Sequence, residues 1–317
     1  MHKTSNVSKN SKNLTGNILS HAKSHFQNRT EAHSRQIAWN GLQLSLPSKW
    51  DVIVSAPRHL LIEQDFKPVV EIRWELDGPA TVEHVVKSLR KSADKSSRDT
   101  IGKIPLPKEF SALATKRGAS GLSWNSEASL NCLLWTCKNT NATIICRLFD
   151  ACKVSTSRII DLLLTITFQK SETTSQLWSV QDFKLSVPSS FQFVDYTFAP
   201  GLTRLAFQNR NMNLQICRLA PALERLASHP LKSILAALQG DVDAGEVIQD
   251  EPMLLETCSY PTLIQQLRMR LKRNKPFQWG RIWHVEEHNR ILALTAESIR
   301  PFELDTVHEI CSQYEII

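Results

Sequence analysis

The sequence has little of what the common nucleotide-binding and hydrolytic enzymes require. It contains only 10 glycines in 317 residues, and it has neither a G-x-x-x-x-G-K-[ST] nor a G-x-G-x-x-G phosphate-binding loop. The H-E-x-x-H zinc motif, the EF-hand loop and the G-x-S-x-G nucleophile motif are also missing. These absences lead us to expect a protein that is not an enzyme, with no catalytic residues and no cofactor.

Long apolar runs are missing as well. No stretch approaches the 18 or more consecutive apolar residues of a membrane-spanning helix, and the polar, basic start of the chain has no secretory apolar block. Hydrophobic residues nevertheless make up 42% of the chain, which is typical of a protein that buries a core. We therefore expect a cytoplasmic protein without a transmembrane segment.

The seven cysteines do not form the pattern of a metal site. Four of them follow the spacing C-x4-C-x8-C-x5-C, which lacks the C-x2-C pairs of zinc sites. Cys132, Cys146, Cys217 and Cys311 each lie within an apolar strand or helix pattern. Such thiols usually behave as small core residues, so we expect buried free cysteines and no metal.

Positive charge is concentrated near the N-terminus. Residues 1–38 carry six Lys or Arg and one Glu, a net charge of +5 out of the +7 of the chain. This polar, basic composition predicts a disordered tail. Within it, Leu14, Ile18 and Phe26 recur near helical spacing, and we expect them to contact a partner. An inert solubilising arm is the alternative.

An internal repeat organises the remaining sequence. The run 41–50, GLQLSLPSKW, returns 141 positions later as 182–191, DFKLSVPSSF. At an offset of 148, Trp135 and Ile144 match Trp283 and Leu292. Two amphipathic patterns also return in the same order, 82–89 as 231–238 and 155–168 as 303–316. Blocks that recur in order at a nearly constant offset indicate a duplicated module.

Apolar and polar residues alternate in each copy, which predicts short antiparallel strands. In the first copy we expect strands at 42–46, 51–55, 59–63, 69–75, 110–115, 121–127, 130–136 and 143–149. The amphipathic patterns predict helices packed on this sheet. The expected fold is α+β, with two similar domains, each an antiparallel sheet flanked by helices. The expected boundaries are a tail at 1–38, copy 1 at 39–169, a linker at 170–177 and copy 2 at 178–317.

The first strand of each copy carries a family resemblance. Pro47 with Trp50, repeated as Pro188 with Phe191, resembles the opening motif of the PsbP-like family, which includes DcrB-like proteins. The motif is short, but the resemblance in pattern covers most of each copy. It implies a binding or assembly role and brings no catalytic residues with it.

Copy 2 contains a basic helical segment at 262–275 that has no equivalent in copy 1. Its apolar side consists of Leu263, Ile264, Leu267 and Leu271. Its positive charges, which could contact a partner, are Arg268, Arg270, Lys272, Arg273 and Lys275. A helix face that is merely solvated is the alternative.

Three functional hypotheses follow from these features. The leading one is a non-catalytic protein-interaction or assembly subunit, which binds protein partners of a larger complex through the tail and the basic helix. The second is nucleic-acid binding by the same basic elements. The third is an enzyme that acts at a cleft between the two copies. A chaperone or adaptor for apolar client segments is a variant of the first hypothesis.

Overall fold

The computed structural model describes residues 34–76, 81–92, 101–123, 130, 132–137, 139–149, 154–169, 173–240, 246–272 and 274–317. These residues form two compact units. Unit 1 holds the described residues up to Ile37 together with Leu42–Phe168, and unit 2 holds Ala38–Gly41 together with Gln169–Ile317. Strand β1 (Ser34–Trp39) begins inside the expected tail, and β11 (Ser175–Val180) begins inside the expected linker.

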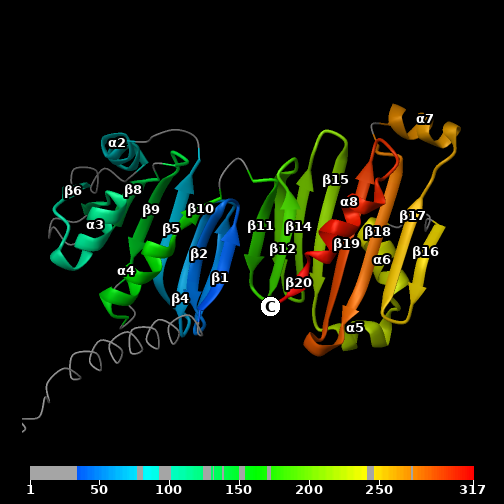
Figure 1. The fold of residues 1–317 in the computed structure, drawn as a ribbon, viewed down its shortest axis with the longest axis horizontal. Coiled ribbons are helices and arrows are strands. Elements are labelled where there is room, and N and C mark those ends of the chain that lie inside the picture. The colour runs from blue at the N-terminus through cyan, green and yellow to red at the C-terminus, as the bar shows by residue number, and fades with distance from the viewer. Residues whose placement is uncertain are drawn as a thin grey trace, which may run out of the picture. The chain divides into compact units, whose positions relative to one another are not determined.

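Unit 1 is built on a seven-stranded antiparallel sheet (Figure 1). Short runs of β-branched and aromatic residues form its strands, as their propensities favour. The strand order is β3 (Trp50–Ala56), β4 (His59–Gln64), β5 (Lys67–Glu75), β9 (Thr143–Leu148), β8 (Cys132–Thr136), β7 (Ser120–Ser123) and β6 (Gly102–Ile104). Apart from this sheet, β2 (Leu42–Pro47) pairs with the two-residue β10 (Thr167–Phe168).

Three short α-helices accompany the unit 1 sheet in its described residues. They are α2 (Val82–Ser92), α3 (Ser111–Arg117), which follows the 3-10 turn η1 (Lys108–Phe110), and α4 (Thr156–Thr165). The strand predicted at 110–115 was wrong, because this segment is the start of α3. Gly118 ends that helix in the left-handed conformation, with φ 68°, which glycine adopts without strain.

Unit 2 repeats the large sheet of unit 1 strand for strand. Its order is β13 (Gln192–Ala199), β14 (Leu202–Gln208), β15 (Met212–Leu219), β19 (Arg290–Ser298), β18 (Phe277–Val285), β17 (Leu254–Ser259) and β16 (Glu246–Glu251). The register also agrees, because Trp135 pairs with Ile144 in unit 1 and Trp283 pairs with Leu292 in unit 2. These are the residues that match at an offset of 148 in the sequence.

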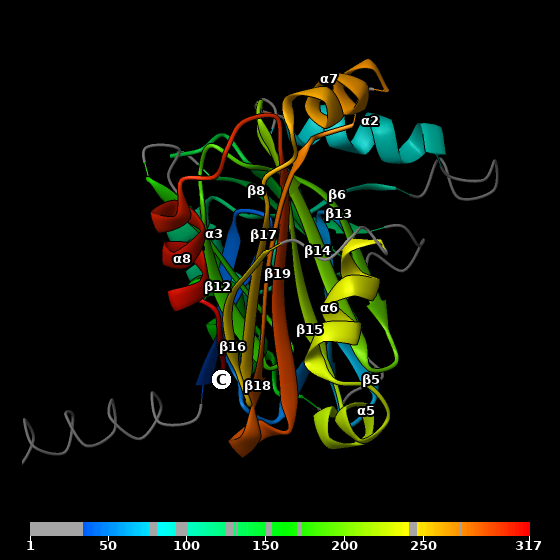
Figure 2. The same ribbon diagram turned by 90° about the vertical axis from the view of Figure 1, so that its right-hand side faces the viewer.

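The two faces of the unit 2 sheet are covered differently. Helix α6 (Leu231–Gln239) packs on one face, next to α5 (Ala222–Ser228), while α8 (Leu304–Ser312) lies on the opposite face (Figure 2). Side chains alternate along β17, so Leu255 joins the core under α6 and its neighbour Glu256 contacts His308 of α8. The remaining elements are η2 (Glu286–His288) and α7 (Leu263–Leu271).

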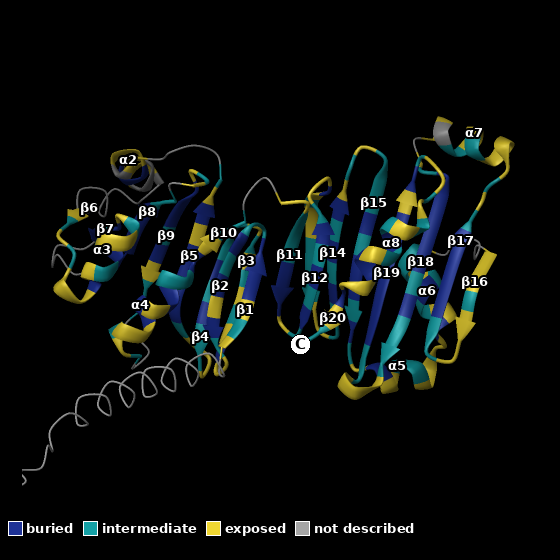
Figure 3. Ribbon diagram, in the orientation of Figure 1, coloured by how far each residue is buried: buried dark blue, intermediate teal, exposed yellow. Residues whose placement is uncertain are grey.

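Aromatic side chains fill the core of unit 2 on the face away from α6. There β11 pairs with β12 (Phe183–Pro188), and β12 pairs with β20 (Glu315–Ile316). Trp178 of β11 lies 4.7 Å from Phe193 and 5.0 Å from Phe207, measured between ring centroids. Trp39 joins them, 5.2 Å from Trp178. Figure 3 shows the resulting buried strands in dark blue.

The expectation of an α+β fold with helix-flanked sheets was wrong. The described protein is mostly β, 49% strand against 26% helix, with large antiparallel sheets and few helices. The physical reason is visible in unit 2, where strands such as β11 and β12 supply aromatic residues to one face of the sheet. Strands therefore cover part of the apolar surface that helices were expected to cover. No helix among the described residues is long and apolar enough to cross a membrane.

Candidate functional site

The basic segment of copy 2 forms helix α7, between strands β17 and β18. In Figure 1 the helix projects beyond the ends of these strands. Strand β17 ends at Ser259, and Pro261 cannot donate to a strand ladder because it lacks a backbone N–H. The chain therefore leaves the sheet here and begins a helix at Leu263.

Reciprocal hydrogen bonds cap the start of α7. The backbone N–H of Thr262 donates to Gln265 Oε1 at 2.8 Å, and the backbone N–H of Gln265 donates to Thr262 Oγ1 at 3.5 Å. This is the capping-box arrangement, in which two free backbone donors at a helix start find acceptors. Gln266 adds a side-chain bond to the carbonyl of Pro261 at 2.8 Å. Local bonds thus define where this helix begins.

The apolar face of α7 consists of four aliphatic side chains that are open to solvent. The exposed fractions are 81% for Leu263, 73% for Ile264, 63% for Leu267 and 78% for Leu271. At about 100° per residue, these four positions fall within an arc of about 100°. Burying a side chain of this size is worth about 1.5–3 kcal/mol. Covering this face with another apolar surface would therefore lower the free energy of the protein.

The opposite side of α7 is turned toward its own unit. Gln266 and Met269 are half-buried, whereas the four aliphatic residues are exposed. In Figure 3 the helix stands apart from the dark-blue strands of the sheet. The apolar residues, which would normally form the packed side of an amphipathic helix, therefore face away from the protein.

Of the predicted positive charges, the structure places two on the exposed surface of the α7 segment. Arg268 and Lys272 are exposed. The side chain of Arg270 and the whole of Arg273 lie outside the described residues. Lys275 is directed elsewhere, because its Nζ donates to Asn213 Oδ1 of β15 at 2.6 Å. Burial lowers the pKa of Lys275, while Glu297 opposes that shift.

The predicted contact residues of the tail, Leu14, Ile18 and Phe26, lie outside the described residues. The exposure of the apolar side of α7 was not predicted from the sequence. Periodicity identified these leucines and isoleucine as one face of a helix, but it gave no sign that the face is uncovered. The signal in the sequence was the absence of an equivalent segment in copy 1, because an insertion has no counterpart in the shared core.

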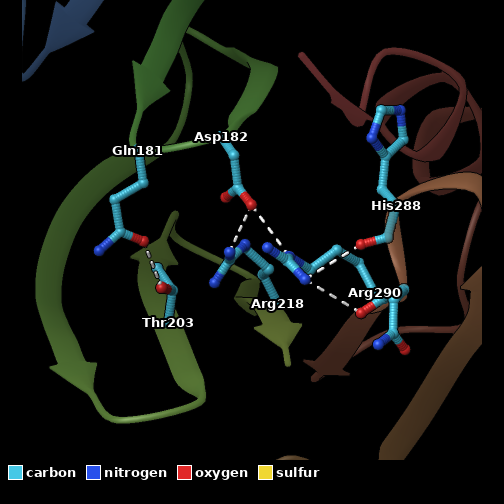
Figure 4. Close-up of polar contacts among 7 residues, drawn as sticks. Gln181, Asp182, Thr203, Arg218, His288 and Arg290 are labelled. Carbon is cyan, nitrogen blue, oxygen red and sulfur yellow. Dashed lines mark hydrogen bonds and ion pairs between the residues drawn. The ribbon is translucent and has the colours of Figure 1, made fainter. Parts of the chain in front are cut away.

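Three clusters in the described residues centre on a carboxylate. In Figure 4, Asp182 Oδ2 accepts hydrogen bonds from Arg218 and from Nε of Arg290, the latter at 2.9 Å. Burial alone would raise the pKa of Asp182, but the two arginines outweigh it and lower that pKa below its usual value. Nearby, the hydroxyl of Thr203 donates to Gln181 at 2.8 Å.

The second cluster surrounds Glu256, which is 1% exposed. Trp279 Nε1 donates to Glu256 Oε1 at 2.9 Å, and His308 Nε2 lies 2.8 Å from the same oxygen. Arg281 Nη1 lies 3.4 Å from Glu256 Oε2. Trp279 and Arg281 come from the neighbouring strand β18, and His308 comes from α8. Both oxygens of the buried Glu256 carboxylate therefore have polar partners, and these contacts connect β17 with β18 and α8.

In the third cluster, Glu71 Oε1 lies 2.7 Å from His59 Nε2 and accepts a hydrogen bond from Arg73 Nε at 2.8 Å. Burial and the charge of Arg73 lower the pKa of His59 against the opposing effect of Glu71. Among the described residues, the side chains that contact Asp182, Glu256 and Glu71 in these clusters are those of arginine, histidine and tryptophan, and no serine, threonine or cysteine nucleophile is among them. Their geometry is that of ion pairs between elements of the fold.

The four cysteines that the apolar patterns place in the core are found there. Cys132, Cys146, Cys217 and Cys311 are free and buried. Burial raises the pKa of Cys132, Cys217 and Cys311 to about 12, so they remain protonated and are weak nucleophiles at neutral pH. In the part of the chain that the structure describes, no three His, Cys, Asp or Glu residues are grouped so as to hold a metal ion.

No protein-family model matches this chain, and no curated protein matches it. The functional interpretation therefore depends on the geometry of the described residues, and α7 is the element whose geometry is least explained by folding alone.

Proposed function

We propose that this chain is a non-catalytic docking subunit, which attaches to a larger assembly through the apolar face of α7. The observation that carries the proposal is the exposure of Leu263, Ile264, Leu267 and Leu271, at 63–81% each. An isolated helix of nine residues is marginal in water, so covering this face would also stabilise the helix. The cytoplasmic location and the tail contacts expected from the sequence belong to the same proposal.

The same observation favours docking over nucleic-acid binding. Phosphate contacts require cations on the surface that meets the nucleic acid, whereas the outward arc of α7 is mainly aliphatic. Arg268 lies beside that arc rather than within it. A chaperone that receives apolar client segments would use the same face, and it is a variant of the docking function.

Gel filtration of native lysate tests the proposal. The wild-type chain is expected to elute within a larger assembly, and Leu267→Asp is expected to elute as the free chain. Leu223→Asp on α5 is the matched control, because Leu223 and Leu267 are both 63% exposed. Co-elution of Leu267→Asp with the wild type would rule out docking through α7.

A further inference from the structure

We propose that the surface covered by α7 is a lipid bilayer that contains anionic lipid, with the helix axis parallel to the membrane plane. This inference rests on the proposed docking function, and it names the partner of the same face. A helix that lies in the membrane interface combines an aliphatic face with Lys and Arg beside it. Helix α7 has both features on its exposed side.

The orientation of α7 suits a membrane surface. Gln266 and Met269 on its other side are half-buried, and Gln266 donates to the carbonyl of Pro261, whereas the four aliphatic residues are exposed. When this face enters the boundary between headgroups and acyl chains, the body of the unit remains in water.

Charge along the α7 segment itself is complementary to an anionic surface, although Glu246 of β16, which pairs with Cys258, places one carboxylate near Tyr260. Arg268 and Lys272 are exposed, and the long stems of such side chains let their charges reach the headgroups while apolar neighbours are buried. The sequence contains no Asp or Glu from 257 to 285. An anionic bilayer therefore meets no repelling carboxylate from this part of the chain.

An aromatic residue stands just before the helix. Tyr260 is 55% exposed, and tyrosine is enriched at the headgroup level of membranes. The apolar face itself contains only leucine and isoleucine, without the Trp, Tyr or Phe side chains that dominate binding in protein interfaces. This composition favours a bilayer over a groove on an acidic protein.

Sedimentation with lipid vesicles tests the inference. The full-length chain is expected to bind vesicles of phosphatidylcholine with phosphatidylglycerol, and to bind vesicles of phosphatidylcholine alone much more weakly. Binding should weaken as NaCl is added, because salt screens the attraction to anionic lipid. Replacing Arg268 and Lys272 by glutamine should lower the affinity by about fivefold for each cation removed.

The apolar contribution is tested by Leu267→Asp, which is expected to reduce vesicle binding more than about tenfold. Leu223→Asp should bind like the wild type. Equal vesicle binding by Leu267→Asp and the wild type, or no binding to phosphatidylglycerol vesicles at low salt, would overturn the inference.

The two proposals fail in distinguishable ways. If vesicles are not bound but Leu267→Asp still leaves its native assembly, docking stands and an acidic protein surface replaces the bilayer as the partner. If light scattering shows that Leu267→Asp converts a dimer into a monomer, the occupant is a second copy and the lipid inference is wrong. If Leu267→Asp changes none of these properties, both proposals are wrong.

Discussion

Among single residues, partly buried charges join elements of unit 2 that are distant in sequence. Asp182 follows Gln181, whose φ of 55° marks the tight turn between β11 and β12. Its carboxylate meets Arg218 of β15 and Arg290 of β19. All three side chains are 27% exposed or less, so solvent screens their attraction only in part. This cluster should contribute to stability in a manner that depends on pH.

We predict that the Asp182 cluster stabilises the protein above acidic pH. The pKa of Asp182 is lowered in the folded state, so the unfolded chain takes up a proton first as the pH falls. The contribution is complete above the unfolded pKa of about 3.9 and is lost as the pH drops through the folded pKa. Asp182→Asn should reduce the free energy of unfolding at pH 7 by about 1.5–3 kcal/mol.

Urea titrations at neutral and acidic pH measure this effect. In Asp182→Asn, the free energy of unfolding should decrease less between neutral and acidic pH than it does in the wild type. Asp195→Asn, at an exposed position on β13, should show the same decrease as the wild type. If the free energy of unfolding of Asp182→Asn falls with pH in parallel with that of the wild type, the cluster makes no pH-dependent contribution to stability.

Two helices of unit 2 with the same length show how differently an amphipathic pattern can be used. Both α6 and α7 span nine residues. Leu235 of α6 is 1% exposed and lies in the core with Leu255 and Ile282. The aliphatic residues of α7 have no such cover. The stability of α6 thus comes from packing, whereas α7 depends on its capping bonds.

This difference predicts unequal costs for the same substitution. Leu235→Ala should lower the free energy of unfolding by about 2–5 kcal/mol, because it leaves a cavity in the core. Leu267→Ala should change it by less than about 0.5 kcal/mol, as at other exposed positions. Denaturant unfolding of both variants measures the contrast. A large loss for Leu267→Ala would mean that this face is packed in solution.

Sequence patterns predicted these elements well where the period was clear and sustained. Helices α2, α4, α6 and α8 lie within or close to the predicted amphipathic patterns, and β2 lies at the predicted first strand. The segment 110–115 was wrong because six residues, FSALAT, are too few to separate a period of two from one of 3.6. Periodicity also cannot say what covers a face, which is why the open side of α7 was visible only in the structure.

Across the whole molecule, the two units share their large sheet and differ in the connections between its strands. In unit 1, η1 and α3 lie between β6 and β7, whereas residues 252–253 alone join β16 to β17 in unit 2. Strands β7 and β8 of unit 1 are joined by residues 124–131, while β17 and β18 of unit 2 are joined by the longer segment 260–276. The longer connection contains α7. Function specific to unit 2 is therefore expected in this connection rather than in the sheet that both units share.

At this scale the sequence was less informative. The repeat and its register could be predicted from matching residues such as Trp135 and Trp283, because equivalent tryptophans at a constant offset can be recognised in the sequence itself. The mostly β architecture could not. Whether strands or helices cover a sheet depends on contacts between residues far apart in sequence, such as Trp178 with Phe207. The alternation of apolar and polar residues along a strand does not predict these contacts.

Hydrogen–deuterium exchange of the backbone amides of 263–274 is the most direct test of the docking account. In the free chain, α7 should exchange much faster than α6, because no packing protects it. Phosphatidylglycerol vesicles should slow exchange in α7 in the wild type but not in Leu267→Asp. Slow exchange of α7 in the free chain, equal to that of α6 and unchanged by vesicles, would contradict the claim that its apolar face is an open docking surface.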